Sequence, residues 1–465
     1  MRRALLTPAL ALSLTACIAG PEAVPTASDA AVPESFLFAP EATPADEAQV
    51  AALLPDDPAF AALAETALAQ NPTLGQAIAR LDIARASAAR AGAERLPSLG
   101  YDAGVQGSRT NINAPDNLPL ETEQVAYSAN LTARWDPDIF GRLRNAERAA
   151  LLRIDAADAD AAAVRLALTA DIAGAVTDWR TLQAREAALR SDLNAATRLA
   201  DLAGTREEAG IAPGFDRFRA ETQAAASRSR LAALDSARAE LLGRLVALTA
   251  LPAGDVVAAL ELEDEADMLA PPPPSLPSVL VASRPDIQAA AFRLQAADAD
   301  LAATAAQRFP RISLSAGIGL LAFAMGDIFD ADSVVANATA GLAGPLLDFG
   351  RIEAEIDAGE AQTRLAFQQY RGALFTAFGE VESAYALVAA ADAEAAATLE
   401  EAEMATRAAN LADTRYRAGL DNFLTVLEAR RVADASGDRA AAALGRAQRA
   451  RVLLWQALGG SPLAL

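Results

Sequence analysis

The chain has 465 residues, of which 52% are hydrophobic but only 5% aromatic, and its 40 basic and 61 acidic side chains give a net charge of −21. So acidic a balance argues against nucleic acid as a partner, because phosphate binding needs clustered positive charge. The chain has no histidine, the commonest general base and metal ligand, and its single cysteine cannot form an internal disulfide or a thiolate zinc site. The composition favours a structural or conducting protein over an enzyme, and we expect neither a metal nor a cofactor.

Residues 1–16 resemble a secretory signal peptide, with a short basic start and an apolar run over residues 4–14. Small residues then lead directly to Cys17, which is the order of a bacterial lipobox. We predict that Cys17 becomes the lipidated first residue of the mature chain; the alternative is a plain signal peptide with an incidental cysteine. By resemblance to other bacterial lipoproteins, Ile18 favours the outer membrane. Residues 17–57 are rich in Pro and Ala and are expected to form an extended tether with little structure.

A long internal repeat organises the rest of the chain, with one copy over residues 58–251 and a second over residues 284–465. A Pro-rich linker, residues 252–283, joins them. Several landmarks recur in the same order in both copies. They are Ala79-Arg80-Leu81 and Phe292-Arg293-Leu294, Arg95-Leu96-Pro97 and Arg308-Phe309-Pro310, Phe140-Gly141-Arg142 and Phe349-Gly350-Arg351, Thr205-Arg206 and Thr414-Arg415, and Ala209-Gly210 and Ala418-Gly419.

Each copy begins with a helical pattern, which in the first copy runs over residues 58–94. The period then changes to two in a pair of strands separated by a polar loop. The predicted strands are residues 99–106, 125–135, 312–318 and 334–342. They are about as long as tilted strands that cross a membrane, although a half-buried strand pair in a soluble sheet would alternate in the same way. After the signal peptide no run of about 18 apolar residues occurs, so any membrane passage should be made of strands.

A long stretch without proline follows each hairpin and predicts a helix of unusual length, over residues 143–209 in the first copy. At 1.5 Å per residue such a helix is about 100 Å long and must pack lengthwise on others. Its apolar positions include a coiled-coil spacing at Leu189, Leu193, Ala196, Ala200 and Ala203. Each rod should turn at Gly210 or Gly419, and return helices are expected over residues 216–251 and 424–458.

Two strands in each copy make four in each chain, too few to close a barrel when the smallest single-chain barrels have about eight. Open sheet edges are not tolerated in lipid. We therefore predict a mainly α-helical protein with a small membrane β-barrel portion. Three copies would share a barrel of about 12 strands, continued by a long antiparallel α-helical barrel.

The lipobox, the four strands in two hairpins and the two-fold repeat together resemble the TolC-type outer-membrane factors, and within them the NodT or OprM-like efflux lipoproteins. The motif that ends in Phe140-Gly141-Arg142, its partner Phe349-Gly350-Arg351 and the turn before Gly419 carry this resemblance. It covers nearly the whole mature chain. It implies a homotrimer in outer-membrane lipid, a periplasmic adaptor protein and an inner-membrane pump of the resistance-nodulation-division (RND) class.

The resemblance also implies a gate at the periplasmic helix tips. In the family, a Tyr before the second turn commonly bonds an Asp after the first, and Tyr416 and Asp216 match these positions. An acidic ring narrows the entrance, and Glu428 matches one of its members. Converging carboxylates repel one another, which raises their pKa, and their negative charge attracts cations. We therefore expect a cation-preferring entrance.

The sequence departs from the family at two gate positions. Thr425 replaces an acidic residue of some members, and Asp421 replaces an Arg that some members place two residues after the second turn. Arg417 is the nearby candidate to substitute for that Arg.

Three classes of function remain in view. An outer-membrane exit duct for efflux explains the strands, rods, repeat and lipobox together, and a type I protein-secretion duct is a variant of it. A non-conducting periplasmic coiled-coil scaffold explains the rods but not the hairpins. An enzyme is the weakest reading, because neither a histidine nor a Gly-rich phosphate loop accompanies the carboxylates.

Overall fold

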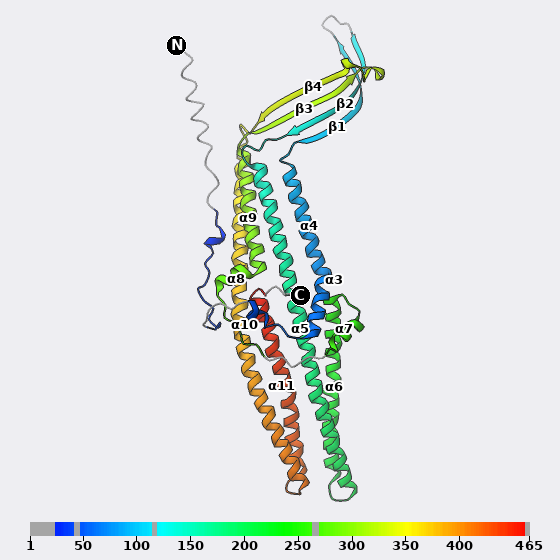
Figure 1. Cartoon of the computed structure of the whole chain (residues 1–465), viewed down its shortest axis with the longest axis vertical. Coiled ribbons are helices and arrows are strands. Elements are labelled where there is room, and N and C mark those ends of the chain that lie inside the picture. The colour runs from blue at the N-terminus through cyan, green and yellow to red at the C-terminus, as the bar shows by residue number, and fades with distance from the viewer. Residues whose placement is uncertain (1–23, 41–46, 114–118, 263–268, 461–465) are drawn as a thin grey trace. The chain divides into compact units, whose positions relative to one another are not determined.

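The computed structural model describes residues 24–40, 47–113, 119–262 and 269–460 (Figure 1). The predicted signal peptide and Cys17 lie outside these residues. The chain divides into two compact units. The sheet unit comprises Met1–Ala30, Arg80–Ala157 and Ala290–Tyr370, and the tip unit comprises Ala31–Ala79, Asp158–Ala289 and Arg371–Leu465.

The sheet unit contains an antiparallel sheet in which the four strands lie side by side in chain order (Figure 1). These strands are β1 (Ser98–Asn113), β2 (Pro119–Trp135), β3 (Arg311–Ala322) and β4 (Val334–Ala343). The predicted hairpins are therefore confirmed. The first hairpin is longer than its alternating pattern indicated, because β1 and β2 remain paired beyond it through the polar residues up to Asn113 and Pro119.

Alternation places apolar side chains on one face of the sheet across all four strands. Tyr101 on β1 lies opposite Leu131 on β2, Leu131 lies opposite Ile318 on β3, and Ile318 lies opposite Ala336 on β4. The other face is polar or small. There the amide of Asn130 donates to the Asp102 carboxylate at 2.9 Å. This face is apolar from the helix end of the hairpin up to the Val105–Tyr127 pair and becomes polar beyond it, at Arg109 and Glu123. Such a band suits contact with lipid on that side and water on the other.

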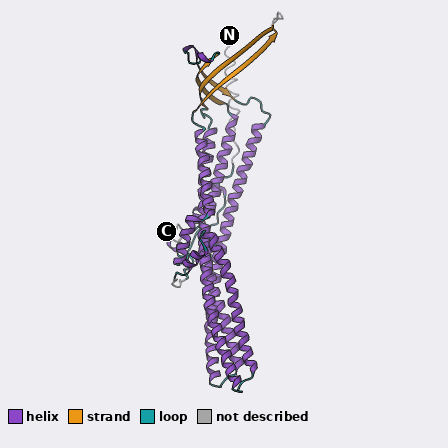
Figure 2. Ribbon diagram, turned by 90° about the vertical axis from the view of Figure 1, so that its right-hand side faces the viewer, coloured by secondary structure: helices purple, strands orange, loops and turns teal. Residues whose placement is uncertain are grey.

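The long helices form two antiparallel pairs, as the absence of proline predicted. They are α5 (Arg142–Glu208) with α6 (Gly214–Thr249), and α10 (Arg351–Arg417) with α11 (Phe423–Ala457). In the tip unit the C-terminal part of α5 lies beside α6 and that of α10 lies beside α11 (Figure 1), and Figure 2 shows the same bundle turned by 90°. Arg185 of α5 holds Asp438 of α11 through two nitrogen–oxygen contacts of 2.7 and 3.1 Å. The element order therefore confirms the mainly helical fold and its two-fold repeat.

One helix expected over residues 58–94 is two helices, α3 (Pro58–Gln70) and α4 (Pro72–Ala93). The chain breaks at Asn71, which is extended with ψ 124°. Pro72 cannot donate a backbone hydrogen bond to the preceding turn, and the Asn71 side chain accepts from the N–H groups of Thr73 and Leu74 at 2.8 and 3.0 Å. The Asn-Pro pair thus ends one helix and caps the next.

The Pro-rich linker contains two short helices, α7 (Ala253–Leu260) and α8 (Pro277–Ser283), and α9 (Pro285–Ala305) follows it. The remaining regular elements are a short helix, α2 (Glu47–Ala51), and the 3-10 turns η1 (Ala27–Asp29), η2 (Ala306–Arg308), η3 (Met325–Asp327) and η4 (Ala331–Ser333). The linker is therefore partly helical.

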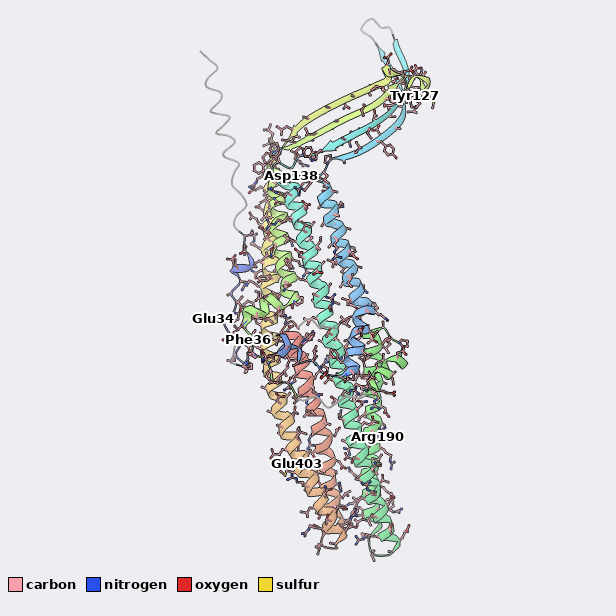
Figure 3. All side chains as sticks on the ribbon, viewed as in Figure 1. Glu34, Phe36, Tyr127, Asp138, Arg190 and Glu403 are labelled. Carbon is pink, nitrogen blue, oxygen red and sulfur yellow. The ribbon has the colours of Figure 1, made fainter. Side chains whose placement is uncertain are left out.

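Part of the region expected to be a loose tether, residues 36–38, packs against α10. The Phe36 ring, labelled in Figure 3, is only 7% exposed and lies 6.2 Å from the ring of Phe378. The backbone N–H groups of Leu37 and Phe38 donate to the Glu382 carboxylate at 2.8 and 3.2 Å. This segment has little regular structure, as expected, yet it is attached to α10 by these contacts.

Among the described residues, α10 contains one stretch long and apolar enough to cross a membrane by composition, although the sequence predicted none. The difference arises because a few charged residues interrupt the stretch without making it polar on average. It is 39% buried within the chain, and core helices of soluble proteins have the same composition, so it is weak support for a membrane span.

Candidate functional site

The two helix tips close in the same way. After α5, Gly210 has φ +72°, and the N–H of Ile211 donates to the carbonyl of Arg206 at 2.9 Å. After α10, Gly419 has φ +75°, and the N–H of Leu420 donates to the carbonyl of Arg415 at 2.9 Å. A left-handed residue that ends a helix is typically glycine, since a side chain is strained there. Both predicted turn glycines therefore lie where the chain reverses.

Tyr416, the predicted gate tyrosine, is a packed residue. It is only 6% exposed, and its ring lies 5.9 Å from that of Phe423 in an edge-to-face arrangement. The guanidinium of Arg206 lies 4.7 Å from the centre of the same ring. The surrounding apolar cluster joins all four helices of the tip through Leu199, Ala203, Ala220, Ala412, Phe423 and Val426. Tyr416 therefore holds the first repeat's tip to the second.

Asp216, the predicted partner of Tyr416, is half-buried in the first turn of α6. Within the part of the chain that the structure describes, no hydrogen bond joins it to Tyr416. The tyrosine ring is instead covered by Arg206, a residue that the sequence analysis used only as a repeat landmark. The sequence offers an arginine one helical turn before a helix-ending glycine, but nothing in it identifies Tyr416 as the partner of this arginine.

Asp421, which stands where some family members have an Arg, pairs with Arg415. Arg415 Nε lies 3.3 Å from the Asp421 carboxylate, whereas Arg417 pairs with Asp413 at 3.1 Å. The four-residue spacing along α10 favours the pairing of Arg417 with Asp413. The hydroxyl of Thr425, the backbone N–H of Asn422 and Arg415 together hold the pKa of Asp421 below its usual value.

Glu428 lies on the exposed face of α11. Its side chain is 58% exposed, and its Oε1 lies 3.7 Å from a guanidinium nitrogen of Arg431. The Thr425 hydroxyl one turn earlier donates to the Asn422 side chain at 3.1 Å. Glu428 is therefore solvated within a single chain.

A second acidic group joins α5 to α11 and was not predicted. Asp434 is buried, with 5% exposure, and accepts from the Gln223 amide at 3.3 Å. Burial, followed by the charge of Asp434, raises the pKa of Asp192 to about 7. Asp192 therefore loses its proton near neutral pH instead of near pH 4. Sequence reasoning missed this pair because its members lie far apart in the chain.

The repeated Phe-Gly-Arg motifs lie where the strands meet the long helices. In the first, the Phe140 ring stacks on Phe309 with centres 4.8 Å apart and planes 6° apart. Gly141 has φ +79°, and α5 begins at Arg142. The carboxylate of Asp138, labelled in Figure 3, accepts from the N–H of Arg144 at 2.7 Å and so caps the helix.

In the second motif Phe349 has φ +53° and Gly350 has φ +85°, and α10 begins at Arg351. Asp348 accepts from the N–H of Ile352 at 3.0 Å, and this bond holds the pKa of Asp348 below its usual value. Phe349 itself is 91% exposed. The two junctions therefore share a capping mechanism, but only the first has a packed aromatic ring.

In the described part of the chain, no group of three or more potential metal-ligating side chains gathers.

The sequence profile of the outer membrane efflux protein family matches residues 63–251 and 276–460, most of the chain and both repeats. The chain belongs to this family.

Relatives of known name in the family match most of the chain. The pyoverdine export outer membrane protein OpmQ of Pseudomonas aeruginosa is 32% identical over 410 residues, which cover 87% of this chain and 85% of OpmQ. The outer membrane protein OprJ of the same species is 31% identical over 417 residues, covering 86% and 83%. Both relatives are named as outer-membrane proteins, and OpmQ is named as an export protein.

A solved structure of the outer-membrane channel OprN shares the fold, with a TM-score of 0.85 and 26% identity over 95% of this chain and 99% of that one. The fold and the sequence family agree. This efflux-family protein is therefore an outer-membrane channel subunit, mainly helical with a β-barrel portion, and it extends into the periplasm.

Proposed function

We propose that this chain is the exit duct of a tripartite efflux system and works as a homotrimer. The four-stranded sheet with an apolar band across one face carries this proposal. Among the described strands, β1 and β4 each have one side without a neighbour. Lipid does not tolerate such open edges, and four strands are too few for a barrel. Three copies supply about 12 strands and leave no edge.

The partners in this proposal are a periplasmic adaptor and an inner-membrane RND-type pump. The names of relatives support a pump-linked role, since they include a toluene efflux pump outer membrane protein and an antibiotic efflux pump outer membrane protein, both of Pseudomonas putida. The named substrates differ between relatives of similar identity. A permissive duct, with selection made by the pump, accounts for this variety.

The lipid anchor at Cys17 is part of the same proposal. The single cysteine of the chain follows an apolar signal sequence. Mass spectrometry of the N-terminal peptide should find a diacylglycerol thioether and an amide-linked acyl chain on Cys17, and a Cys17→Ser variant should carry neither. An unmodified cysteine in the mature wild type would contradict the anchor.

The proposed gate lies at the helix tips, where Tyr416 and Asp216 hold the entrance and Glu428 contributes negative charge. The burial of Tyr416 between helices of both repeats supports a restraining role, and the exposure of Glu428 leaves it free to face passing ions. The double variant Tyr416→Phe with Asp216→Ala should raise conductance. Unchanged conductance would count against the lock.

Two measurements test the duct itself. Native mass spectrometry of the detergent-solubilised protein should give the mass of three chains, and planar bilayers containing it should show discrete, cation-preferring conductance steps. Glu428→Ala should weaken the cation preference, whereas the matched change of another exposed glutamate, Glu400→Ala on α10, should leave it unchanged. A monomer without conductance would refute the proposal.

A further inference from the structure

The two repeats contact each other inside the sheet unit in three ways. The Phe140 ring of the first repeat stacks on Phe309 of the second, at 4.8 Å. Arg153 of α5 pairs with Asp300 of α9. Strand β2 pairs with β3, so that Trp135 lies opposite Leu314 and Ala133 lies opposite Ala316. Each contact uses the later part of repeat one and the earlier part of repeat two.

The repeat assigns a counterpart to each of these residues. From the Phe-Gly-Arg motif onward the two copies are 209 positions apart, so Phe140 corresponds to Phe349 and Arg153 to Gln362. From the helix before the hairpin through its first strand they are 213 positions apart, so Phe309 corresponds to Leu96 and Asp300 to Ser87.

Among the residues that the structure describes, no hydrogen bond, ion pair or ring contact joins Phe349 to Leu96 or Gln362 to Ser87, and all four are exposed. Phe349 is 91% exposed and Leu96 is 65% exposed, and both Gln362 and Ser87 lie on the surface. Phe349 also has a left-handed backbone, φ +53°, which is unfavourable for a side chain of its size. A large apolar ring held exposed in a strained conformation suggests a surface that is covered in the assembly.

The same correspondence predicts a strand register. We extend the 209-residue spacing back from the motif through β2 and use the 213-residue spacing for β3. The pairing of β2 with β3 then places Leu342 of β4 opposite Ala103 of β1, and Ala340 opposite Val105. Both pairs lie on the apolar face. The intervening residues, Gly341 and Gly104, both lie on the polar face. A register shifted by one residue would bring apolar residues opposite polar ones, so this agreement is an independent check on the transfer.

We propose that a second copy of this chain binds here through the repeat's own contacts. Its Leu96 covers Phe349, its Ser87 meets Gln362, and its β1 pairs with β4 so that Val105 faces Ala340. The contact is head-to-tail, and such an interface generates a closed ring when the rotation closes. The inference deepens the proposed homotrimer by naming the residues that join its subunits.

Disulfide trapping tests the register. The double variant Ala340→Cys with Val105→Cys, and Thr339→Cys with Gln106→Cys from the other face, sample both kinds of antiparallel pair, in which Cα atoms lie about 4.5 or 5.5 Å apart. At least one should convert most of the protein into covalent trimers on a non-reducing gel. The control, Ala340→Cys with Leu99→Cys, separates the two sulfurs by about 20 Å along the strand and should not cross-link.

Charge restoration tests the helix contact. Gln362→Arg with Ser87→Asp recreates, between copies, the pair that Arg153 and Asp300 form within one copy. The double variant should dissociate at a higher temperature than either single variant or the wild type. Since both positions are exposed in the chain, neither change should impair folding.

The outcomes separate the two proposals. A trimer mass in native mass spectrometry with no cross-link at either predicted pair, or with cross-linking only at the control pair, would overturn the register but leave the duct intact. No trimer at all would instead refute the proposed function.

Discussion

The two helix tips share a sequence motif but use it differently. Each repeat has Thr-Arg one turn before its glycine, at Arg206 and Arg415. Arg206 lies over the ring of Tyr416, whereas Arg415 pairs with the partly exposed carboxylate of Asp421. The tyrosine itself corresponds to Glu207, which pairs with Arg217 at 2.8 Å. Duplication has therefore preserved the turn while one copy acquired the packing residue and the other a charged surface.

Truncating Tyr416 and its counterpart Glu207 should give the largest difference in unfolding free energy between the two tips. Tyr416→Ala removes a buried ring from a cluster that joins four helices, so we expect a loss of about 3 to 4 kcal/mol in unfolding free energy. Its counterpart Glu207→Ala removes a partly exposed ion pair and should cost under about 1 kcal/mol. Denaturant titration of both variants measures the difference, and equal losses would show that Tyr416 is not a core residue.

The acidic positions in the middle of the helices should differ in their response to pH. Asp192 has its pKa raised to about 7, chiefly by burial and Asp434, while its counterpart Glu401 pairs with exposed Arg439. A raised acid pKa stabilises the fold at low pH, and this contribution is lost as pH rises toward 7.

The wild-type Tm should therefore fall by a few degrees between pH 5 and pH 8, an effect moderated by the partial exposure of Asp192. Asp192→Asn should remove much of that slope. The matched change Glu401→Gln should leave it nearly intact. Thermal scans at several pH values decide this, and parallel curves for the wild type and Asp192→Asn would contradict it.

The turn glycines should be equivalent. Gly210 and Gly419 have nearly the same positive φ, and an added Cβ would meet no atom within 4 Å at either site. Alanine should therefore cost only backbone strain, about 1 kcal/mol at each turn. Chemical denaturation of the two single variants measures this. A much larger loss at one turn would reveal a contact that distinguishes the tips.

The two arginines should give the smallest contrast. Arg206→Gln removes a cation from the face of a buried tyrosine and should cost about 1 kcal/mol. Arg415→Gln removes an exposed ion pair, so its effect on stability should be smaller still. Comparing the Tm of the two variants tests the order, and the reverse order would assign the greater structural role to the second turn.

Much of the fold was accessible from the sequence, because its signals are local and periodic. Alternation predicted all four strands, and the absence of proline predicted the long helices to within a few residues. The break at Asn71 escaped because the apolar pattern continues through it. The lipobox and the family resemblance supplied the candidate gate, but they did not indicate that Arg206 would cover Tyr416.

The repeat, the order of the elements, the two turn glycines and the resemblance to an outer-membrane family could be predicted from the amino-acid sequence. The contacts between distant side chains, such as Asp192 with Asp434 and Phe140 with Phe309, became known only from the folded chain. The reason is geometric. The apolar pattern of a helix of 67 residues leaves its rotational phase loosely specified, since a straight helix drifts by about 20° per heptad, and distant contacts depend on that phase.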